Sequence, residues 1–193
     1  MKKLVLSSIV IGAALVLQSF QSKSLDLQAG NKEITKSQVV WKAYKVTGSH
    51  SGSVGLKSGA LTFDGNKLSG GSFIIDMTTL ACTDLEGDYK NKLEGHLKSD
   101  DFFGVEKHGT SALNITKVKS TGKNSYQVKG DLKIKGISKS IDFQVSIYGN
   151  KASANLKVDR TDFGIKYGSG SYFEDLQDKM IYDEFDLNID LEF

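Results

Sequence analysis

The residues of this chain that could support catalysis or bind a metal are three histidines and one cysteine. His50, His96, His108 and Cys82 are of the types that ligate zinc, but their spacings match none of the close-pair motifs of zinc sites. Ser49 and His50 are adjacent, but residues 48–52 do not have the G-x-S-x-G pattern of a nucleophile turn. They lie in a turn-prone region, and the sequence indicates no acidic partner for the histidine. We therefore expect no catalytic residue, no metal and no cofactor.

Carboxylates are numerous, but no pair of them is selected for acid–base work. Most lie at expected turns or on the polar faces of expected helices, where solvation explains them. They are Asp84, Glu86, Asp88, Asp100, Asp101, Glu174, Asp175 and Asp178. The phosphate-binding patterns G-x-x-x-x-G-K-S/T and G-x-G-x-x-G do not occur either.

The N-terminus has the pattern of a secretory signal. Lys2 and Lys3 precede an apolar run from Leu4 to Leu17, and small residues at 22–24 suit cleavage after residue 24, with 19–21 as the alternative site. An uncleaved anchor is the other interpretation, although about 20 apolar residues are needed to span a bilayer. We expect a signal peptide over 1–24, one domain over 25–193, and a periplasmic or secreted protein.

Removal of a signal peptide would change the net charge of the chain. The whole chain has a net charge of +2, whereas cleavage after Ser24 leaves 22 basic and 23 acidic residues, a net charge of −1. Such a chain has no electrostatic footprint for nucleic acid. Cys82 cannot form an internal disulfide, so we expect a small buried apolar residue there, with a reactive thiol as the alternative.

Alternation of apolar and polar residues dominates from Ser37 onward and predicts eight strands. The clearest case has Phe185, Leu187, Ile189, Leu191 and Phe193 on one face and acidic or amide side chains on the other. The eight expected strands are 39–47, 53–63, 70–78, 111–118, 128–135, 141–147, 152–158 and 185–193.

Short Gly-rich connections between these strands predict antiparallel neighbours. Asp64-Gly65-Asn66 is a strong hairpin signal, and 121–124, 136–139 and 149–150 favour tight turns as well. Two segments break the alternation and predict short helices over 84–97, capped by Thr83 or Asp84, and over 171–180.

Eight antiparallel strands, each with one apolar face, form either a sandwich or a closed barrel. Closure removes the edge strands that invite aggregation. A barrel of eight strands is at the size where the interior is either filled by side chains or holds one small ligand. We expect an all-β, eight-stranded antiparallel barrel of the lipocalin-like kind, with one or two short helices.

Five segments, in order, resemble the YceI-like family. They are 40–52 with Val40-Trp41, 71–80 (GSFIIDMTTL), 96–107 with Asp100-Asp101-Phe102-Phe103, 130–139 (GDLKIKGISK), and 159–165 (DRTDFGI). In this order they are spread over most of the mature chain, from residue 40 to residue 165. The resemblance implies a lipocalin-like barrel, exported to the periplasm, with a long apolar cavity for polyisoprenoids or other amphiphiles.

One stretch departs from the family pattern. After the Phe-Phe segment the family has an aromatic residue, a proline and a later phenylalanine, whereas residues 108–113 here read His-Gly-Thr-Ser-Ala-Leu. The start of that strand is therefore expected to be looser and the cavity there wider or differently shaped.

The resemblance makes an exported, non-enzymatic carrier of a polyisoprenoid, isoprenoid quinone or fatty amphiphile the expected function. The residues expected to bind the ligand are Trp41, His50, Phe63, Phe73, Ile75, Met77, Leu93, Leu97, Phe102, Phe103, Phe143, Arg160, Phe163 and Ile165.

Two roles remain open for Arg160. It suits a phosphate or carboxylate head group at the cavity mouth, together with His50 and Asp159, or an ion pair with Asp159 or Asp162 that holds its loop. The helix expected over 84–97 would cap one barrel end or act as a lid.

Two other classes of protein remain open. One is a hydrolase-like enzyme with His50 or His96 at the mouth, and the other is a structural envelope protein with a filled core. Partners left open are a membrane, contacted transiently, and a second copy of the chain in a homodimer.

Overall fold

The computed structural model describes residues 30–193. The signal peptide expected over 1–24, its cleavage site and the first residues of the expected domain lie outside this range. Among the described residues, no helix is both long enough and apolar enough to cross a membrane.

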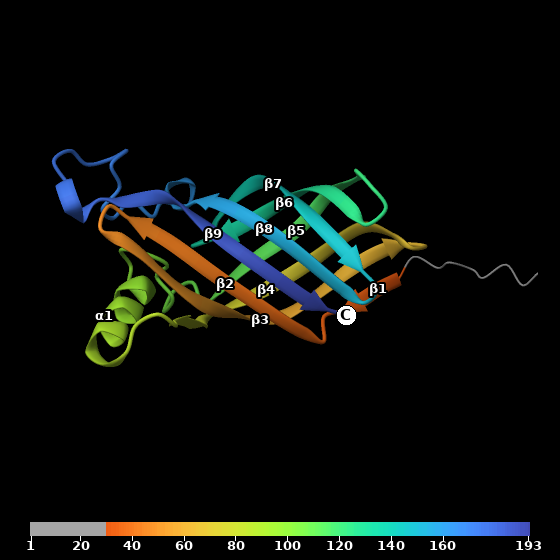
Figure 1. The fold of residues 1–193 in the computed structure, drawn as a ribbon, viewed down its shortest axis with the longest axis horizontal. Coiled ribbons are helices and arrows are strands. Elements are labelled where there is room, and N and C mark those ends of the chain that lie inside the picture. Colours follow the sequence, from red (N-terminus) through yellow and green to blue (C-terminus); the bar gives the residue numbers. More distant parts are fainter. Residues whose placement is uncertain (1–29) are drawn as a thin grey trace, which may run out of the picture.

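Eight antiparallel strands close into a barrel, which confirms the expected fold class (Figure 1). Each strand pairs with the next strand along the chain from β2 to β9, including β4 with β5 on either side of α1, and β9 returns to pair with β2. The barrel strands are β2 Lys36–Lys45, β3 Gly48–Asp64, β4 Lys67–Cys82, β5 Thr110–Ser120, β6 Ser125–Ile134, β7 Ile137–Tyr148, β8 Lys151–Asp159 and β9 Ile181–Glu192.

A ninth strand, β1 (Gly30–Glu33), precedes Ser37, the residue from which strands were expected. It pairs with β3 between Ala60 and Phe63 and extends the sheet locally without entering the ring. Its four residues carry no apolar alternation, so the period-two signal could not reveal it.

The strands β3 and β4 are longer than their alternation predicted. Residues 48–52, expected in a turn, form the start of β3 and pair with β2, because the turn itself lies at Val46 and Thr47. Register shifts in the β3–β4 pair, at Ser53/Gly55 and Leu56/Ser58, interrupt the strict alternation.

Positive φ values place the hairpin turns. Gly65 (φ 59°) and Gly149 (φ 61°) adopt the left-handed conformation, as the sequence predicted. The turn expected to begin at Gly136 lies one residue earlier, at Lys135 (φ 51°) and Gly136 (φ 81°), and β7 begins at Ile137.

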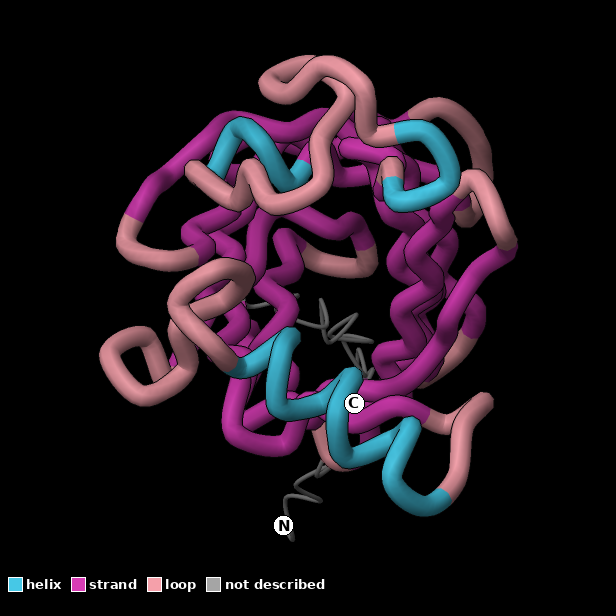
Figure 2. The backbone as a smooth tube through the Cα atoms, turned by 90° about the vertical axis from the view of Figure 1, so that its left-hand side faces the viewer, coloured by secondary structure: helices cyan, strands magenta, loops and turns pink. Residues whose placement is uncertain are grey.

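One of the two expected helices is present. Helix α1 runs from Gly87 to Lys98, three residues later than expected at its start. Its N-cap is Glu86 with no side-chain cap, so neither Thr83 nor Asp84 caps the helix as expected, and Asp84 accepts from the Cys82 thiol instead. Seen along the barrel, α1 crosses the near end of the ring of strands (Figure 2).

The prediction of a helix over 171–180 is wrong. That segment holds only the 3-10 turn Gln177–Lys179, and positive φ values at Asp175 (58°) and Gln177 (50°) interrupt any longer helix. A second 3-10 turn, Arg160–Phe163, follows β8 directly. It was not anticipated, because the family motif it carries gives no helical period.

Candidate functional site

The barrel interior contains a cavity with a volume of about 170 Å³. All eight barrel strands, α1 and the segments that follow α1 and β8 contribute to its wall. Almost every lining side chain is aliphatic or aromatic, and only Ser111, Ser153, Tyr182 and Arg160 carry a hydroxyl or a charge. Such a wall suits an apolar ligand with at most a few polar contacts.

Nine of the fourteen expected ligand-binding residues line this cavity. They come from three strands, the end of α1 and the two segments noted above, so the fold brings together residues that are far apart in the chain. They are Trp41, Phe73, Ile75, Met77, Leu97, Phe102, Phe103, Phe143 and Arg160.

The other five expected residues do not line the cavity. Phe63 packs against Phe193 (ring centroids 5.4 Å apart), where β1 covers β3. Phe163 and Ile165 are almost fully buried in the main core cluster, and Leu93 packs against the smaller cluster around Trp41. His50 lies beside Asp84 instead. Apolar alternation identified buried positions correctly but does not separate a cavity wall from solid core.

Several lining residues were not singled out from the sequence. Most belong to strand faces that the alternation of apolar and polar residues predicts to point inward. That alternation does not distinguish residues of a cavity wall from other core residues. They include Leu113, Leu132, Val145, Leu156, Phe185, Leu187, Ile189 and Leu191. The start of β5, where the family pattern is lost, is tied to β4 because Met77 donates its backbone N–H to the Gly109 carbonyl (3.0 Å).

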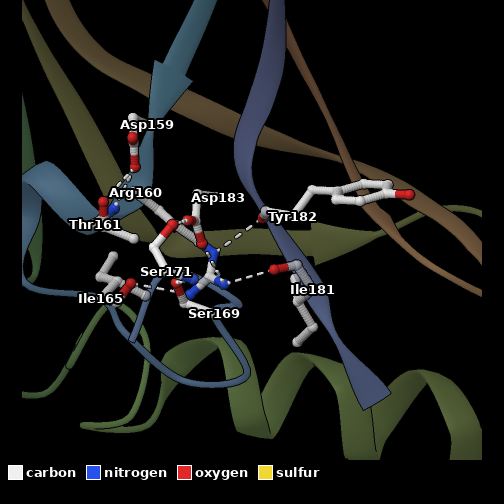
Figure 3. A network of polar contacts seen from close by, with 9 residues as sticks. All are labelled: Asp159, Arg160, Thr161, Ile165, Ser169, Ser171, Ile181, Tyr182 and Asp183. Atoms are coloured by element: carbon white, nitrogen blue, oxygen red, sulfur yellow. Dashed lines mark hydrogen bonds and ion pairs between the residues drawn. The ribbon is translucent and has the colours of Figure 1, made fainter. Parts of the chain in front are cut away.

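Arg160 is the one charged residue in the cavity wall, and its side chain is only 5% exposed. Its guanidinium donates to the carbonyl oxygens of Tyr182 (Nε, 3.2 Å), Ile165 (Nη1, 2.9 Å) and Ile181 (Nη2, 3.0 Å) (Figure 3). Burial lowers the pKa of Arg160, and the negative charge of Asp183 opposes this.

The ion-pair partner of Arg160 is Asp183, with Nη2 and Oδ1 3.3 Å apart. The two partners expected from the sequence are wrong. Asp159 accepts from the backbone N–H of Thr161 (2.8 Å), and Asp162 pairs with Lys139 (3.1 Å). The contacts of Arg160 therefore fasten the segment after β8 to the start of β9 and leave little free donor capacity for a head group.

His50, Asp84 and Cys82 form a small polar cluster behind the wall. The Cys82 thiol donates to Asp84 Oδ1 (2.9 Å), and His50 Nδ1 lies 3.3 Å from Asp84 Oδ2. Burial raises the pKa of Cys82, and the hydrogen bond to Asp84 raises it further. The carboxylate stands between thiol and imidazole, so the cluster does not form a Cys–His nucleophile pair.

No group of three or more His, Cys, Asp or Glu within residues 30–193 is arranged to hold a metal ion. Cys82 is fully buried, as the sequence predicted.

An aromatic group at one end of the barrel connects α1 with the segment before β9. The His96 ring packs edge-on against Phe102 (4.9 Å) and Tyr167 (4.5 Å), and its Nε2 lies 3.6 Å from Asp101 Oδ2. Phe102 lines the cavity, so His96 contacts a residue of the wall and links α1 to the segment that contains Tyr167.

A closed antiparallel barrel around an apolar cavity defines a class of lipocalin-like proteins that can enclose a small apolar ligand. Comparison with protein families places the chain within that class: a model of the "YceI-like domain" matches residues 31–193. The chain belongs to the YceI-like family.

Curated relatives agree with this assignment. A UPF0312 protein of Pseudomonas fluorescens is 29% identical over 177 residues, covering 86% of this chain and 89% of the relative. A UPF0312 protein of Ectopseudomonas mendocina is 39% identical over 54 residues, and that alignment spans only 28% of either chain.

Solved structures share the fold. BcnA of Burkholderia cenocepacia has a TM-score of 0.60 at 20% identity, covering 80% of this chain and 94% of BcnA. The Campylobacter jejuni YceI protein gives 0.54 at 18% identity, over 97% and 98%. A polyisoprenoid binding domain from Saccharophagus degradans gives 0.56 at 13% identity, over 85% and 97%. At these identities the likeness shows the fold alone.

Proposed function

We propose that this protein is an exported carrier that encloses a long apolar chain, such as a polyisoprenoid, an isoprenoid quinone or a fatty amphiphile. The observation that carries the proposal is the apolar cavity, with walls supplied by every strand of the barrel. Such a chain is poorly soluble in water, and a closed barrel covers it without creating an exposed apolar patch.

The cavity volume limits how much of a chain fits inside. The volume of about 170 Å³ lies below the roughly 300–1,000 Å³ of typical ligand pockets, so only part of a long chain fits inside without movement of the wall. Each methylene group that is buried contributes roughly 0.8 kcal/mol, before the cost of ordering the chain. A longer chain must protrude from the barrel or displace side chains of the wall.

Membership in the YceI-like family and the Saccharophagus degradans polyisoprenoid binding domain support binding rather than catalysis. Export is supported by the signal-like pattern of the first 24 residues, and it makes the periplasm or the cell exterior the proposed location. A hollow interior disfavours a structural protein with a filled core. His50 is not among the residues that line the cavity and contacts Asp84 instead, which gives no specific support to a hydrolase.

The single tryptophan makes the proposal directly testable, because Trp41 lines the cavity. Purified full-length protein is first extracted with organic solvent, and the extract is searched by mass spectrometry for apolar chains. The delipidated protein is then titrated with farnesol, palmitate and a short-tailed ubiquinone, each added from ethanol.

The expected result is a saturable change in Trp41 fluorescence for at least one probe, with a parallel rise in the melting temperature. At a ligand concentration of about 100 Kd, stability increases by about 2.7 kcal/mol, which corresponds to roughly 5–10 °C. An extract free of apolar chains, combined with no response to any probe, would show that the interior does not bind such molecules.

A further inference from the structure

The segment between Gly164 and Met180 extends beyond the strand ends, on the side of the barrel that carries α1 (Figure 1). Its side chains Tyr172 and Phe173, here called the aromatic tip, are 49% and 50% exposed. Large aromatic side chains usually bury most of their surface, so two adjacent ones left in water at an extremity indicate a contact made with another body.

The backbone beneath the aromatic tip is firmly held. Phe173 donates its N–H to the carbonyl of Ser169 (3.0 Å), and Ile181 donates to the carbonyl of Gly168 (2.8 Å). Ser169 is fully buried, and the Ser171 hydroxyl donates to Asp183, the partner of Arg160 (2.6 Å). A tip held in this way loses little conformational entropy when it binds.

The exposed apolar surface continues from the tip to the rim of the barrel. Val46, in the turn between β2 and β3, donates its backbone N–H to the carbonyl of Met180 (3.1 Å), and Tyr182 follows on β9. Both side chains are 48% exposed. Arg160 and Ile181, beside them, line the cavity. The surface formed by Val46, Tyr167, Tyr172, Phe173 and Tyr182 therefore adjoins the end of the cavity.

The chemistry of this surface suits a lipid bilayer better than a protein. Half-exposed rings offer about 100 Å² each, so the four rings together with Val46 offer less than the roughly 800 Å² that a stable protein partner covers. Tyrosine combines an apolar ring with a polar hydroxyl and is enriched where bilayers meet water. Lys166 lies over the ring of Tyr172 (4.2 Å), where it can direct its charge toward head groups.

The charge of the segment distinguishes between kinds of bilayer. Residues 164–180 contain Lys166 and Lys179 against Glu174, Asp175 and Asp178, a net charge of −1. A slightly acidic segment is not attracted to anionic lipid, so its contact with a bilayer must come from the aromatic rings.

We propose that this end of the barrel docks on a zwitterionic phospholipid bilayer through the aromatic tip, so that an apolar chain passes between membrane and cavity without crossing water. The inference rests on the proposed function, since a carrier of insoluble chains must meet the membrane that holds them. The inference specifies which part of the protein contacts the membrane.

Sedimentation with phosphatidylcholine vesicles tests the docking. The variant Tyr172→Ser/Phe173→Ser is compared with wild type and with Tyr148→Ser. The Tyr148 side chain is 64% exposed and lies at the last residue of β7, at the opposite barrel end. All three proteins keep residues 1–29, so any binding by that segment is common to them. We expect the tip variant to bind at least tenfold more weakly and Tyr148→Ser to bind like wild type.

A second measurement locates the contact even if another part of the chain also binds vesicles. In Phe173→Trp, the new indole is expected to be quenched by phosphatidylcholine brominated on its acyl chains, whereas the indole of Tyr148→Trp is not. Unchanged sedimentation of the tip variant, an unquenched Phe173→Trp, or stronger binding to phosphatidylglycerol than to phosphatidylcholine vesicles would each overturn the proposal.

Uptake experiments separate docking from ligand binding. The tip variant is expected to take up farnesol from ethanol with the Trp41 response of wild type, but to take it up from phosphatidylcholine vesicles at least tenfold more slowly. Equal uptake rates from vesicles would overturn the docking inference alone. If the Trp41 fluorescence of wild type does not respond to dissolved farnesol, that result would instead count against the proposed function.

Discussion

At the scale of single residues, the surroundings of Arg160 decide what its charge can do. An arginine beside a lipid cavity suggests head-group recognition, yet its guanidinium already serves three backbone carbonyls and Asp183. Hydrogen bonds of this kind hold the 3-10 turn Arg160–Phe163 and the start of β9 together. The structure therefore favours a role in positioning the rim.

Replacing Arg160 with leucine is expected to destabilise the protein strongly. The change leaves the carboxylate of Asp183 and three carbonyls without their partner, and breaking a buried pair in this way costs about 3–5 kcal/mol. For a domain of this size, that lowers the melting temperature by roughly 6–20 °C. Urea unfolding measures the loss, and Arg160→Leu/Asp183→Leu should recover part of it. A loss below about 1 kcal/mol would mean that Arg160 does not hold the rim.

Asp84 gives stability a dependence on pH. Burial acts to raise its pKa, but hydrogen bonds from Cys82, the Ser51 backbone and His50 outweigh it and hold the pKa below its ordinary value. A lowered folded-state pKa means that the contribution of Asp84 is present above the unfolded value and is lost as pH falls through the folded value.

The variant Asp84→Asn should therefore be less stable than wild type at pH 7, by about 1 kcal/mol for one net hydrogen bond. Thermal melts at decreasing pH should show the two proteins converging once the carboxyl of wild type is protonated. A difference that stays constant into strong acid would mean that the charge of Asp84 contributes nothing.

At the scale of elements, α1 is attached more loosely than the strands. None of its residues is buried, although Leu93 and Leu97 contact the smaller core cluster. Its attachments include a hydrogen bond from the Cys82 backbone to Glu94 (2.8 Å) and the packing of His96 on Tyr167. An element with so little buried surface opens at low free-energy cost.

Hydrogen exchange is expected to reflect this difference. Amides within Gly87–Lys98 should exchange much faster than those of β6, which pairs with neighbours on both sides. Ligand in the cavity should slow exchange in α1 more than in β6, because Leu97 is part of the cavity wall. Equal protection of α1 and β6 in the ligand-free protein would exclude α1 as a lid.

At the scale of the whole molecule, the free interior volume is the property on which function depends. Ala154 on β8 lines the cavity, and the next residue, Asn155, faces the outside of the same strand. The variant Ala154→Phe should fill part of the cavity and weaken farnesol binding at least tenfold without loss of thermal stability. Asn155→Phe is the matched control and should bind like wild type. Trp41 fluorescence measures both, and unchanged affinity in Ala154→Phe would place the ligand elsewhere.

Local patterns made most of the barrel predictable. Side chains of a strand point alternately to its two faces, so the run from Phe185 to Phe193 reveals both the strand and its inner face. Turn positions such as Gly65 and Gly149 are also local, because they depend on which residues tolerate positive φ. The helix expected over 171–180 failed because an apolar period of three or four residues can also occur in an irregular segment.

The sequence by itself determined the strands, their inward faces, the antiparallel order and, through five motifs, the family. Only the tertiary structure decided which buried residues line a cavity and which, such as Phe163 and Ile165, fill solid core. It also decided that Arg160 binds Asp183, and that Asp84 binds His50, which is 34 positions away. The physical reason is that alternation is a property of neighbours along the chain, whereas free volume and ion pairing arise from groups that meet only when the sheet closes.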